Sequence, residues 1–523
     1  MQTKTLSGFQ LSPQQKHLWV LQQDSSVYFT QCAIRLEGVL KLEVLKAALQ
    51  QIVNRHEIFR TSFRRLPGVK TPVMVVEDRS LPLWQDIDLS NRDDREQSAK
   101  IEELFQEARR RGFDFEQGSL LRLSLLRLSA NMHILHVCLP GLCADNWTIK
   151  NLVAEVSNSY SECLKGEEPC TEVVQYLQFS EWQNQLLEDE EAEAANEYWL
   201  QQKLSSLDGL KLPFESKSLS KFEPECFQCA IAPDVTAKIE TLAQKYDTSA
   251  AVVLLAYWQT LIWRLTGQPD IIIGMASDRR DYEELHEVMG LLATWLPIKS
   301  HLAPDLRFFE VIELAKQTLA KAEEWQDYFI PEPVGNDNAL AFPIGFEFVQ
   351  VPEKFSIAGV SFSLEKQESY IEQFKLKLTC TWHDDAPSAS LHYDVNSFSA
   401  ETISRLARQF QTLLTHAIEN PDTAIAQLEI LQASDRQQLL VEFNQTQIDY
   451  PLDKCIHQLF EEQAQKTPDC VAVVFEDEQF TYAQLNQKVN RLAYYLQQQG
   501  VKPEVVVGLC VERSLDAIVG LLG

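Results

Sequence analysis

The sequence predicts an α/β fold of two successive lobes, because strand and helix patterns alternate along the chain and then begin again. An apolar strand pattern at 29–36 is followed by an amphipathic helix whose apolar positions run from Leu45 to Ile52. From about residue 215 the alternation restarts, with a strand at 225–232. At 523 residues the chain is also too long for one hydrophobic core. Two α/β lobes of similar size are therefore expected.

The first lobe begins with a helix at 11–23, in which Ser12 is the expected cap and Pro13 takes the first helical position. Proline is favoured there because its fixed φ suits a helix and its missing N–H would have no helical partner. The other elements of this lobe are expected at 97–110 (helix), 121–128 and 132–139 (hairpin strands), and 146–164 (helix).

The second lobe contains a long apolar helix at 248–266. Its uninterrupted apolar part ends at Arg264, which makes it too short for a membrane span and typical of a buried helix. The other expected elements are helices at 234–246, 308–326 and 399–419, and strands at 270–274, 296–301, 341–349, 359–364, 374–382 and 388–393.

Composition changes near 432–455, where Gln and Asp dominate. A third segment follows, with helices expected near 455–466 and 482–499 and a strand at 505–510. We therefore divide the chain into a first lobe at 1–185, a second lobe at 186–432, a linker at 433–455 and a further segment at 456–523.

The formal net charge is −28, from 75 acidic and 47 basic residues. This balance argues against nucleic acid and against an anionic membrane as partners. Eleven scattered cysteines fit a reducing compartment, and residues 1–20 carry no signal-peptide pattern, so a cytoplasmic protein is expected. Cys226 and Cys229 form a close CxxC pair, but they lie in an apolar strand pattern without a second pair, so no metal is expected.

The turn from Pro140 to Thr148 is the stretch best suited to a reaction site. An apolar strand ends at Pro140-Gly141, and Asp145 stands where the cap of the next helix is expected. Such a turn exposes loop groups beside a helix N-terminus. We therefore expect its residues to determine the chemistry of the protein.

Several segments, in order along the chain, resemble motifs of the condensation domains of nonribosomal peptide synthetases. Residues 11–19 resemble LSxxQxRLW, and residues 55–63 closely resemble RHExLRTxF. Residues 176–183 resemble YxDYAxWQ, Asp270 to Gly274 with Arg280 and Gly290 keep the spacing DxxxG…R…G, and residues 391–398 resemble LxYxxxLF. Residues 480–485 resemble the LTYxEL motif of adenylation domains.

The resemblance implies two lobes of the chloramphenicol-acetyltransferase type in a V-shaped pseudo-dimer, with a tunnel between them. In that tunnel donor and acceptor carrier proteins present substrates on 4′-phosphopantetheine, and an amine attacks a thioester to form an amide. The domain itself is expected to bind no cofactor and no metal. Residues 456–523 resemble the N-terminal fragment of an adenylation domain, whose phosphate-binding loop would lie beyond Gly523. We expect this fragment to be inactive alone and to work with the remainder of that domain in cis.

The active-site signature of the family, HHxxxDG, is not retained. With Asp145 as the aligned aspartate, Pro140 and Gly141 replace the two histidines and Asn146 replaces the glycine. Glycine has no side chain to accept a proton, so amide formation through that histidine is not expected. The resemblance gives Asp145 a structural role, in a pair with Arg280. The DxxxxDxxS signature of heterocyclisation relatives is also absent, because Pro140 replaces its first aspartate.

Three other residues are candidates for catalysis. Glu347 is an acid in an apolar strand that should line the tunnel, where it would suit proton transfer. An ion pair with a lysine or arginine of the other lobe is the equal alternative. Cys143 lies near a helix N-terminus, which favours a thiolate, although a buried inert cysteine is the simpler interpretation. Thr148 fits either the site or the first turn of the helix.

Two hypotheses follow. The first is an atypical condensation-family enzyme that acts on carrier-tethered acyl or aminoacyl thioesters without the usual histidine, by amide formation or by modification of the tethered substrate. The second is a catalytically inactive platform that docks carrier proteins or a tailoring enzyme. A coenzyme A-dependent acyltransferase is a third, more distant hypothesis, and it also relies on the missing histidine.

Overall fold

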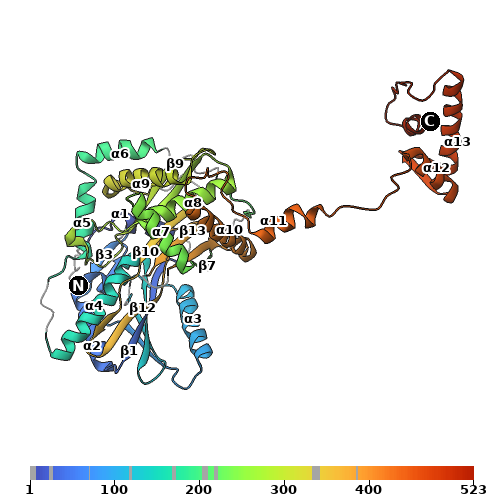
Figure 1. Ribbon diagram of the computed structural model, residues 1–523. Helices are drawn as coiled ribbons and strands as arrows, with labels where there is room; N and C mark the ends of the chain where they lie inside the picture. Colours follow the sequence, from blue (N-terminus) through green and yellow to red (C-terminus); the bar gives the residue numbers. More distant parts are fainter. Residues whose placement is uncertain are drawn as a thin grey trace. The chain divides into compact units, whose positions relative to one another are not determined.

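The computed structural model describes residues 8–22, 27–66, 68–69, 71–116, 120–167, 172–202, 210–216, 222–331, 342–383 and 387–523. The chain forms two compact units, Met1–Asp435 and Arg436–Gly523. The first unit contains two six-stranded sheets with helices packed against them, as expected for an α/β protein (Figure 1).

The first sheet has the strand order β11-β12-β1-β6-β5-β4. Its bounds are β1 Phe29–Gly38, β4 Leu83–Asp88, β5 Arg122–Arg127, β6 Met132–Pro140, β11 Phe355–Ile357 and β12 Val360–Ser369. The predicted hairpin is present as β5 and β6, which pair antiparallel, whereas β4 runs parallel to β5. A small separate hairpin joins β2 (Thr61–Arg64) and β3 (Val73–Val76).

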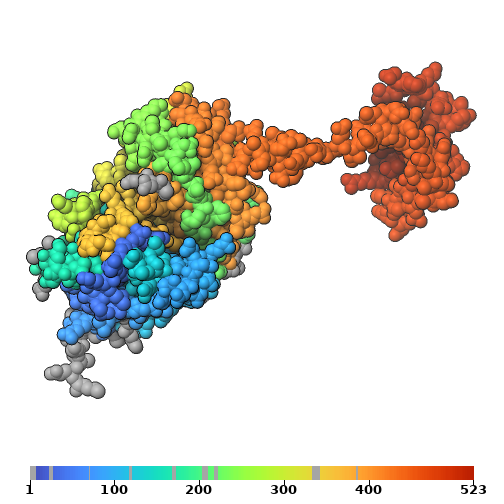
Figure 2. All heavy atoms as spheres, turned by 60° about the horizontal axis from the view of Figure 1, so that its bottom comes forward, coloured from blue at the N-terminus to red at the C-terminus, as the bar shows by residue number. Residues whose placement is uncertain are grey.

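Strands β11 and β12 belong to the first sheet although they come from the second half of the chain. β12 pairs antiparallel with β1 from Thr30↔Ser369 to Gly38↔Val360. Figure 2 shows the same association at the surface, where atoms from later in the first unit lie directly against the blue N-terminal atoms. The two halves of the sequence are therefore interleaved, and both contribute to the region between the sheets.

Helices cover both faces of the first sheet. Cys32, Ile34 and Leu36 of β1 pack in one apolar cluster with α2 (Leu42–Arg55) and α4 (Asn146–Lys165). Ala33 points to the opposite face, where α3 (Asp94–Arg110) packs through Leu104 and Phe105. The remaining helices of this half are α1 (Pro13–Leu21), α5 (Tyr176–Leu186) and α6 (Glu191–Gln201). The predicted cap of α1 is confirmed, because Ser12 accepts a hydrogen bond from the Gln15 amide.

The second sheet has the order β7-β14-β13-β10-β8-β9. Its bounds are β7 Pro224–Ala230, β8 Asp270–Ser277, β9 Thr294–His301, β10 Ile344–Gln350, β13 Leu376–Trp382 and β14 Ser388–Asp394. The helices of this half are α7 (Pro233–Lys245), α8 (Ala250–Thr266), α9 (Phe308–Glu324) and α10 (Ala400–Glu419), with α11 at Ala433–Leu440. α8 is buried along nearly all its length, as its apolar sequence predicts.

The second unit is smaller. It contains α12 (Ile456–Lys466), the hairpin of β15 (Val471–Phe475) and β16 (Glu478–Thr481), α13 (Tyr482–Gln498) and α14 (Leu515–Leu522). The predicted strand at 505–510 is wrong: this stretch is irregular and has no strand beside it among the described residues. Over the described part of the chain, no helix is both long and apolar enough to cross a membrane.

Candidate functional site

The turn singled out in the sequence connects β6 to α4. β6 ends at Pro140, residues Gly141–Cys143 form one turn of 3₁₀ helix, and α4 begins at Asn146. Asp145 caps α4, because its carboxylate accepts a hydrogen bond from the Thr148 amide at 2.7 Å. The turn therefore has the strand–turn–helix form that the sequence predicts.

The Asp145 carboxylate is completely buried, and both of its oxygens are engaged. Arg280 donates to it from both terminal nitrogens, at 3.1 and 3.2 Å. The amides of Leu292 and Ala293 each donate at 3.0 Å. Such a carboxylate has no free oxygen for a substrate. Asp145 is therefore a structural residue, which connects the start of α4 to the chain just before β9.

Gly141 lies in a tightly packed space, where a side chain would press on its neighbours. It is buried, and a Cβ atom added to it would lie 3.0 Å from Leu18 Cδ2 and 3.3 Å from Ile371 Cγ2. These distances are already tight for a single carbon atom, and an imidazole would require both neighbours to move. The space beside Gly141 is thus occupied by side chains of α1 and of the chain that follows β12.

We call Glu368–Phe374, which leads from β12 to β13, the crossing segment. Contacts with the first half of the chain hold it in place. Glu368 pairs with Arg109 of α3 at 2.7 Å, and Glu372 pairs with His17 of α1 at 2.7 Å. The Tyr370 amide donates to the Phe29 carbonyl at 2.9 Å. The segment therefore lies fixed over Gly141.

The charges of this segment are stabilised in their buried positions. Burial alone would lower the pKa of His17, but the charge and hydrogen bond of Glu372 raise that pKa overall. Burial alone would raise the pKa of Glu368, whereas Arg109 and Lys366 lower it overall. The Glu368–Arg109 pair therefore stays ionised near neutral pH. The His17–Glu372 pair is ionised wherever the pH lies below the raised pKa of His17.

Glu347 lies on β10 and is only 6% exposed. Its Oε2 atom accepts hydrogen bonds from Lys377 Nζ at 2.8 Å and from Thr379 Oγ1 at 3.1 Å. Its Oε1 atom accepts a hydrogen bond from the Asn146 side chain. The cation lies on the neighbouring strand β13 of the same sheet, and not in the other lobe as the ion-pair interpretation supposed. The link to the first half of the chain is made by Asn146.

Cys143 and Thr148, the two other candidates from the sequence, contact different groups from those around Glu347. Cys143 is fully buried, and burial raises the pKa of its thiol, which opposes the thiolate that the helix N-terminus would favour. Thr148 Oγ1 lies 2.8 Å from both Asp145 Oδ1 and the Gly290 carbonyl. His136 of β6, which was not a candidate, has its Nε2 atom 3.0 Å from Gln31 Oε1, and burial lowers its pKa to about 4.

A small cavity of about 10 Å³ lies beside the crossing segment, and the sequence did not predict it. It is lined by Phe222, Pro224, Trp295, Tyr370, Ile371, Glu372, Phe374, Lys377, His392 and Tyr393. His392 stands directly opposite Lys377 in the β13–β14 ladder. The alternation of side chains along β14 could have indicated that His392 faces away from the core. Leu391 and Tyr393, on either side of it, are buried in the core, and His392 points to the other face.

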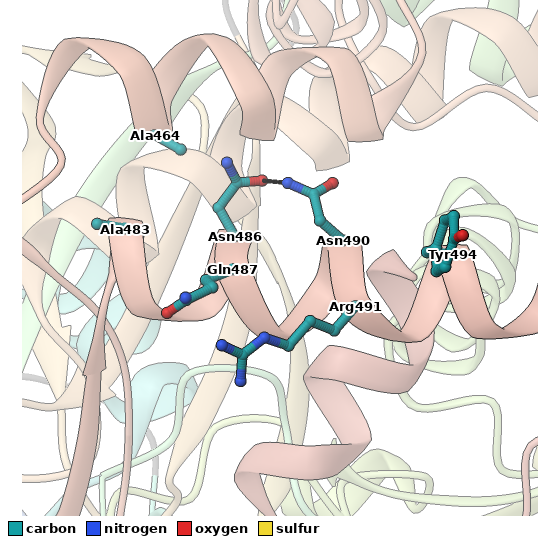
Figure 3. Close-up of a pocket in the computed structure, with 7 residues that line it drawn as sticks. All are labelled: Ala464, Ala483, Asn486, Gln487, Asn490, Arg491 and Tyr494. Carbon is teal, nitrogen blue, oxygen red and sulfur yellow. Dashed lines mark hydrogen bonds between the residues drawn. The ribbon is translucent and has the colours of Figure 1, made fainter.

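The second unit has a shallow groove along α13. It is lined by Ala464, Ala483, Asn486, Gln487, Asn490, Arg491 and Tyr494 (Figure 3). A hydrogen bond of 3.4 Å joins the side chains of Asn490 and Asn486. These residues include no acid–base pair or nucleophile suited to catalysis, so the groove is not a candidate for the reaction site.

Comparison with known proteins assigns the family. A family model described as "Condensation domain" matches residues 7–440. The chain belongs to the condensation-domain family. A second model, "AMP-binding enzyme", matches residues 460–523, so the condensation domain is followed by the start of an AMP-binding domain. The resemblance drawn from the motifs is confirmed.

Relatives of the condensation domain are peptide synthetases. The chain is 30% identical over 528 residues to bacitracin synthase 3 of Bacillus licheniformis, covering 98% of this chain and 8% of that protein. It is 28% identical over 530 residues to gramicidin S synthase 2 of Brevibacillus brevis, covering 98% of this chain and 12% of that protein. The sequence thus spans a small part of the length of these synthetases.

Solved structures show the same fold. The condensation domain of Monacolin K polyketide synthase matches with a TM-score of 0.71 and 21% identity, over 80% of this chain and 99% of that one. The X-domain from teicoplanin biosynthesis matches with a TM-score of 0.68 and 20% identity, over 81% and 98% of the two chains. The predicted fold, two chloramphenicol-acetyltransferase-like lobes with the start of an AMP-binding domain, is confirmed.

Proposed function

We propose that this condensation domain acts as a platform in a nonribosomal peptide synthetase, where it docks carrier proteins and forms no amide bond. The packing at Gly141 carries the proposal. The position aligned with the family's second histidine is a glycine without a side chain, and Leu18 and Ile371 pack tightly around it, so a larger residue would have to displace them. The crossing segment that carries Ile371 is held to the first half of the chain by two ion pairs whose carboxylates are buried, which opposes its displacement.

Glu347 does not replace the missing histidine in this proposal. To take a proton from a substrate it would have to leave Lys377 or share its oxygen with it. Leaving a buried charge without its partner costs about 3–5 kcal/mol, which would be added to the barrier of a reaction in which Glu347 had to leave Lys377. We assign Glu347, Lys377 and Asn146 to the contact between the two halves of the domain. Cys143 and Thr148 are assigned to packing and to the start of α4.

The proposed partners are donor and acceptor carrier proteins bearing 4′-phosphopantetheine, the remainder of the adenylation domain in cis, and a tailoring enzyme. A solved complex of an X-domain with OxyB from teicoplanin biosynthesis has the same fold, with a TM-score of 0.67 over 82% of this chain. That complex supports the idea that a domain of this fold can hold a second protein. We place the lobes at 1–185 and 186–432 and the linker at 433–455, with β11 and β12 crossing to the first sheet.

One observation favours a second candidate function, modification of a tethered substrate. The cavity beside the crossing segment brings Lys377, His392 and Tyr370 together next to the altered signature. Groups of these types can transfer protons, so a rebuilt reaction centre would be located there.

Intact-protein mass spectrometry separates the two functions. The full chain is mixed with loaded donor and acceptor carrier proteins, and the tethered masses are followed while carrier binding is measured in parallel. The platform predicts bound carriers with unchanged masses. A new tethered mass would contradict it, and loss of that mass in Lys377→Met or His392→Asn would assign the chemistry to the cavity. Absence of carrier binding would contradict both functions.

A further inference from the structure

The crossing segment leaves β12 after Ser369 and is irregular as far as the start of β13. Backbone hydrogen bonds fix its two ends. The Tyr370 amide donates to the Phe29 carbonyl at 2.9 Å, and the Lys375 amide, just beyond the segment, donates to the Pro343 carbonyl at 3.0 Å. An irregular stretch of this kind opens locally at less cost than a strand, because no ladder of backbone hydrogen bonds has to break.

Two ion pairs attach the segment to the first half of the chain, and they differ in chemistry. Arg109 of α3 pairs with Glu368 at 2.7 Å, beside the end of β12. His17 of α1 pairs with Glu372 at 2.7 Å, within the irregular part. A guanidinium keeps its charge at every physiological pH, whereas a histidine ordinarily changes its charge near neutral pH. One attachment is therefore permanent, and the other depends on pH.

The pair of His17 and Glu372 is largely shielded from water. The His17 side chain is 11% exposed and the Glu372 side chain 2%, so salt screens their attraction little. Burial opposes a charge on His17, but the charge and hydrogen bond of Glu372 raise its pKa overall. The ion pair is thus fully present below the unfolded value of about 6.5, and it is lost as pH rises through the folded pKa.

The titratable groups on the cavity side of Glu372 keep their charge state near neutral pH. They are Tyr370, Lys377, His392 and Tyr393. Lys377 is held by Glu347 at 2.8 Å. Burial, together with the charges of Lys377 and Arg109, lowers the pKa of His392 well below its ordinary value, so this imidazole stays neutral. Burial raises the pKa of Tyr370, and that of Tyr393 to about 12, so both phenols keep their protons.

The charged groups on the remaining sides have partners of their own. Lys16, which precedes His17 in α1, donates to Asn184 Oδ1 of α5 at 2.7 Å. Lys366 lies 3.4 Å from Glu368, whose carboxylate also pairs with Arg109. The charge of His17 is therefore the quantity through which pH acts on the attachment of Glu372.

The residue before Glu372 in the chain is the one that covers Gly141. Ile371 Cγ2 lies 3.3 Å, and the Tyr370 carbonyl oxygen 3.5 Å, from the point where a Cβ atom of Gly141 would stand. Ile371 is itself only 8% exposed. Because Ile371 and Glu372 are neighbours in the chain, a displacement of Glu372 moves Ile371 as well and uncovers this side of the β6–α4 turn.

We propose that the crossing segment is a strap that responds to pH: it is held over Gly141 while His17 is charged, and its part from Tyr370 to Phe374 opens more often when His17 is neutral. The pairing of β12 with β1 and the Glu368–Arg109 pair hold its beginning in both states. Ile371 and Phe374 keep their apolar contacts in the closed form, so the opening is a transient local event. The strap does not depend on the platform, because it concerns the packing at Gly141 whether or not a carrier binds.

Hydrogen–deuterium exchange of the full chain measures the opening. Exchange is followed by mass spectrometry at several values from about pH 6 to about pH 8.5, and each rate is divided by the intrinsic rate at that pH. Protection of peptides that contain 370–374 should fall about five- to tenfold across this range, since a charge-assisted hydrogen bond is roughly twice as strong as a neutral one. Peptides from β1 and β6 should keep their protection.

Three variants assign the effect to the pair. His17→Gln and Glu372→Gln can still form a hydrogen bond but no ion pair, so both should show low protection of 370–374 at every pH. His301→Gln is the matched control, because His301 pairs with Asp270 at 3.0 Å on the surface of the second sheet, away from the crossing segment. It should keep the pH dependence of the unmodified chain.

Constant protection of 370–374 in the unmodified chain would overturn the strap. A pH dependence that survives in His17→Gln or in Glu372→Gln would overturn it as well, because another group would then control the opening. A parallel loss of protection in β1 and β6 would show unfolding of the whole first unit and would also contradict it. None of these results affects the platform, since no carrier protein enters the measurement.

Discussion

Ile371 Cγ2 lies 3.3 Å from the point where a Cβ atom of Gly141 would stand. In the motif alignment proposed from the sequence, Gly141 takes the place of the second histidine of HHxxxDG. The contact connects the sequence change at the signature to a change in packing, because the crossing segment fills the volume that the lost side chain would need. On the proposed alignment, the absence of the histidine and the tight packing around Gly141 occur together.

Replacing Gly141 should destabilise the first unit without creating activity. Gly141→Ala and Gly141→His crowd Leu18 and Ile371, and overpacking of this kind costs about 1–3 kcal/mol for the smaller change. Urea unfolding monitored on the transition of the first unit measures the loss. Gly508→Ala is the control, because nothing lies within 4 Å of its added Cβ. A stable Gly141→His variant that forms amides would contradict the packing account.

The pair of Glu347 and Lys377 should be a strong structural contact. Lys377→Met removes the cation and leaves a buried carboxylate, which should cost about 3–5 kcal/mol of unfolding free energy. The double variant Glu347→Gln/Lys377→Met should recover part of that loss, because no uncompensated charge remains. A double-mutant cycle in urea measures the coupling. Single and double variants that all unfold like the unmodified chain would show that this pair is not a structural contact.

The pair of His17 and Glu372 should make stability depend on pH. The pKa of His17 is raised in the folded chain, so its contribution is fully present below the unfolded value of about 6.5 and is lost as pH rises through the folded pKa. The free energy of unfolding is measured at several values from mildly acid to mildly alkaline pH. In His17→Gln it should no longer fall over this range on account of the pair. His133 provides a contrast of opposite sign, since burial lowers its pKa, so that it destabilises the folded chain at low pH and this cost disappears as pH rises from the folded pKa to the unfolded value. An identical pH profile for His17→Gln and the unmodified chain would refute the contact.

Cys143 should resist alkylation. Its thiol is buried and burial raises its pKa, so little thiolate is present and reagents have no access. Cys455, Cys470 and Cys510 are exposed and serve as internal controls. Peptide mapping after brief iodoacetamide treatment should find label on these three and none on Cys143. Early labelling of Cys143 would restore it as a candidate nucleophile.

Local sequence signals were enough for much of the fold. The cap at Ser12, the hairpin of β5 and β6 and the strand–turn–helix around Asp145 each depend on residues a few positions apart, and all were predicted. The irregular stretch at 505–510 was predicted as a strand from its apolar residues, yet a strand forms only where a partner strand pairs with it.

Contacts between distant residues could not be predicted in this way. The pairing of β12 with β1 joins residues more than three hundred positions apart, and nothing in either strand specifies its partner. For the same reason the cation beside Glu347 was expected in the other lobe and proved to be Lys377 on the next strand. His392 and Trp295 were missed because only the folded sheet brings them to one cavity.

The most direct test of the platform is the mass of the tethered substrates. The full chain is incubated with loaded donor and acceptor carrier proteins, and each carrier is followed by intact-protein mass spectrometry while its binding is measured. We expect both carriers to bind and every tethered mass to stay unchanged over a long incubation. A condensed or otherwise modified species that forms only in the presence of this domain would show that the platform is wrong.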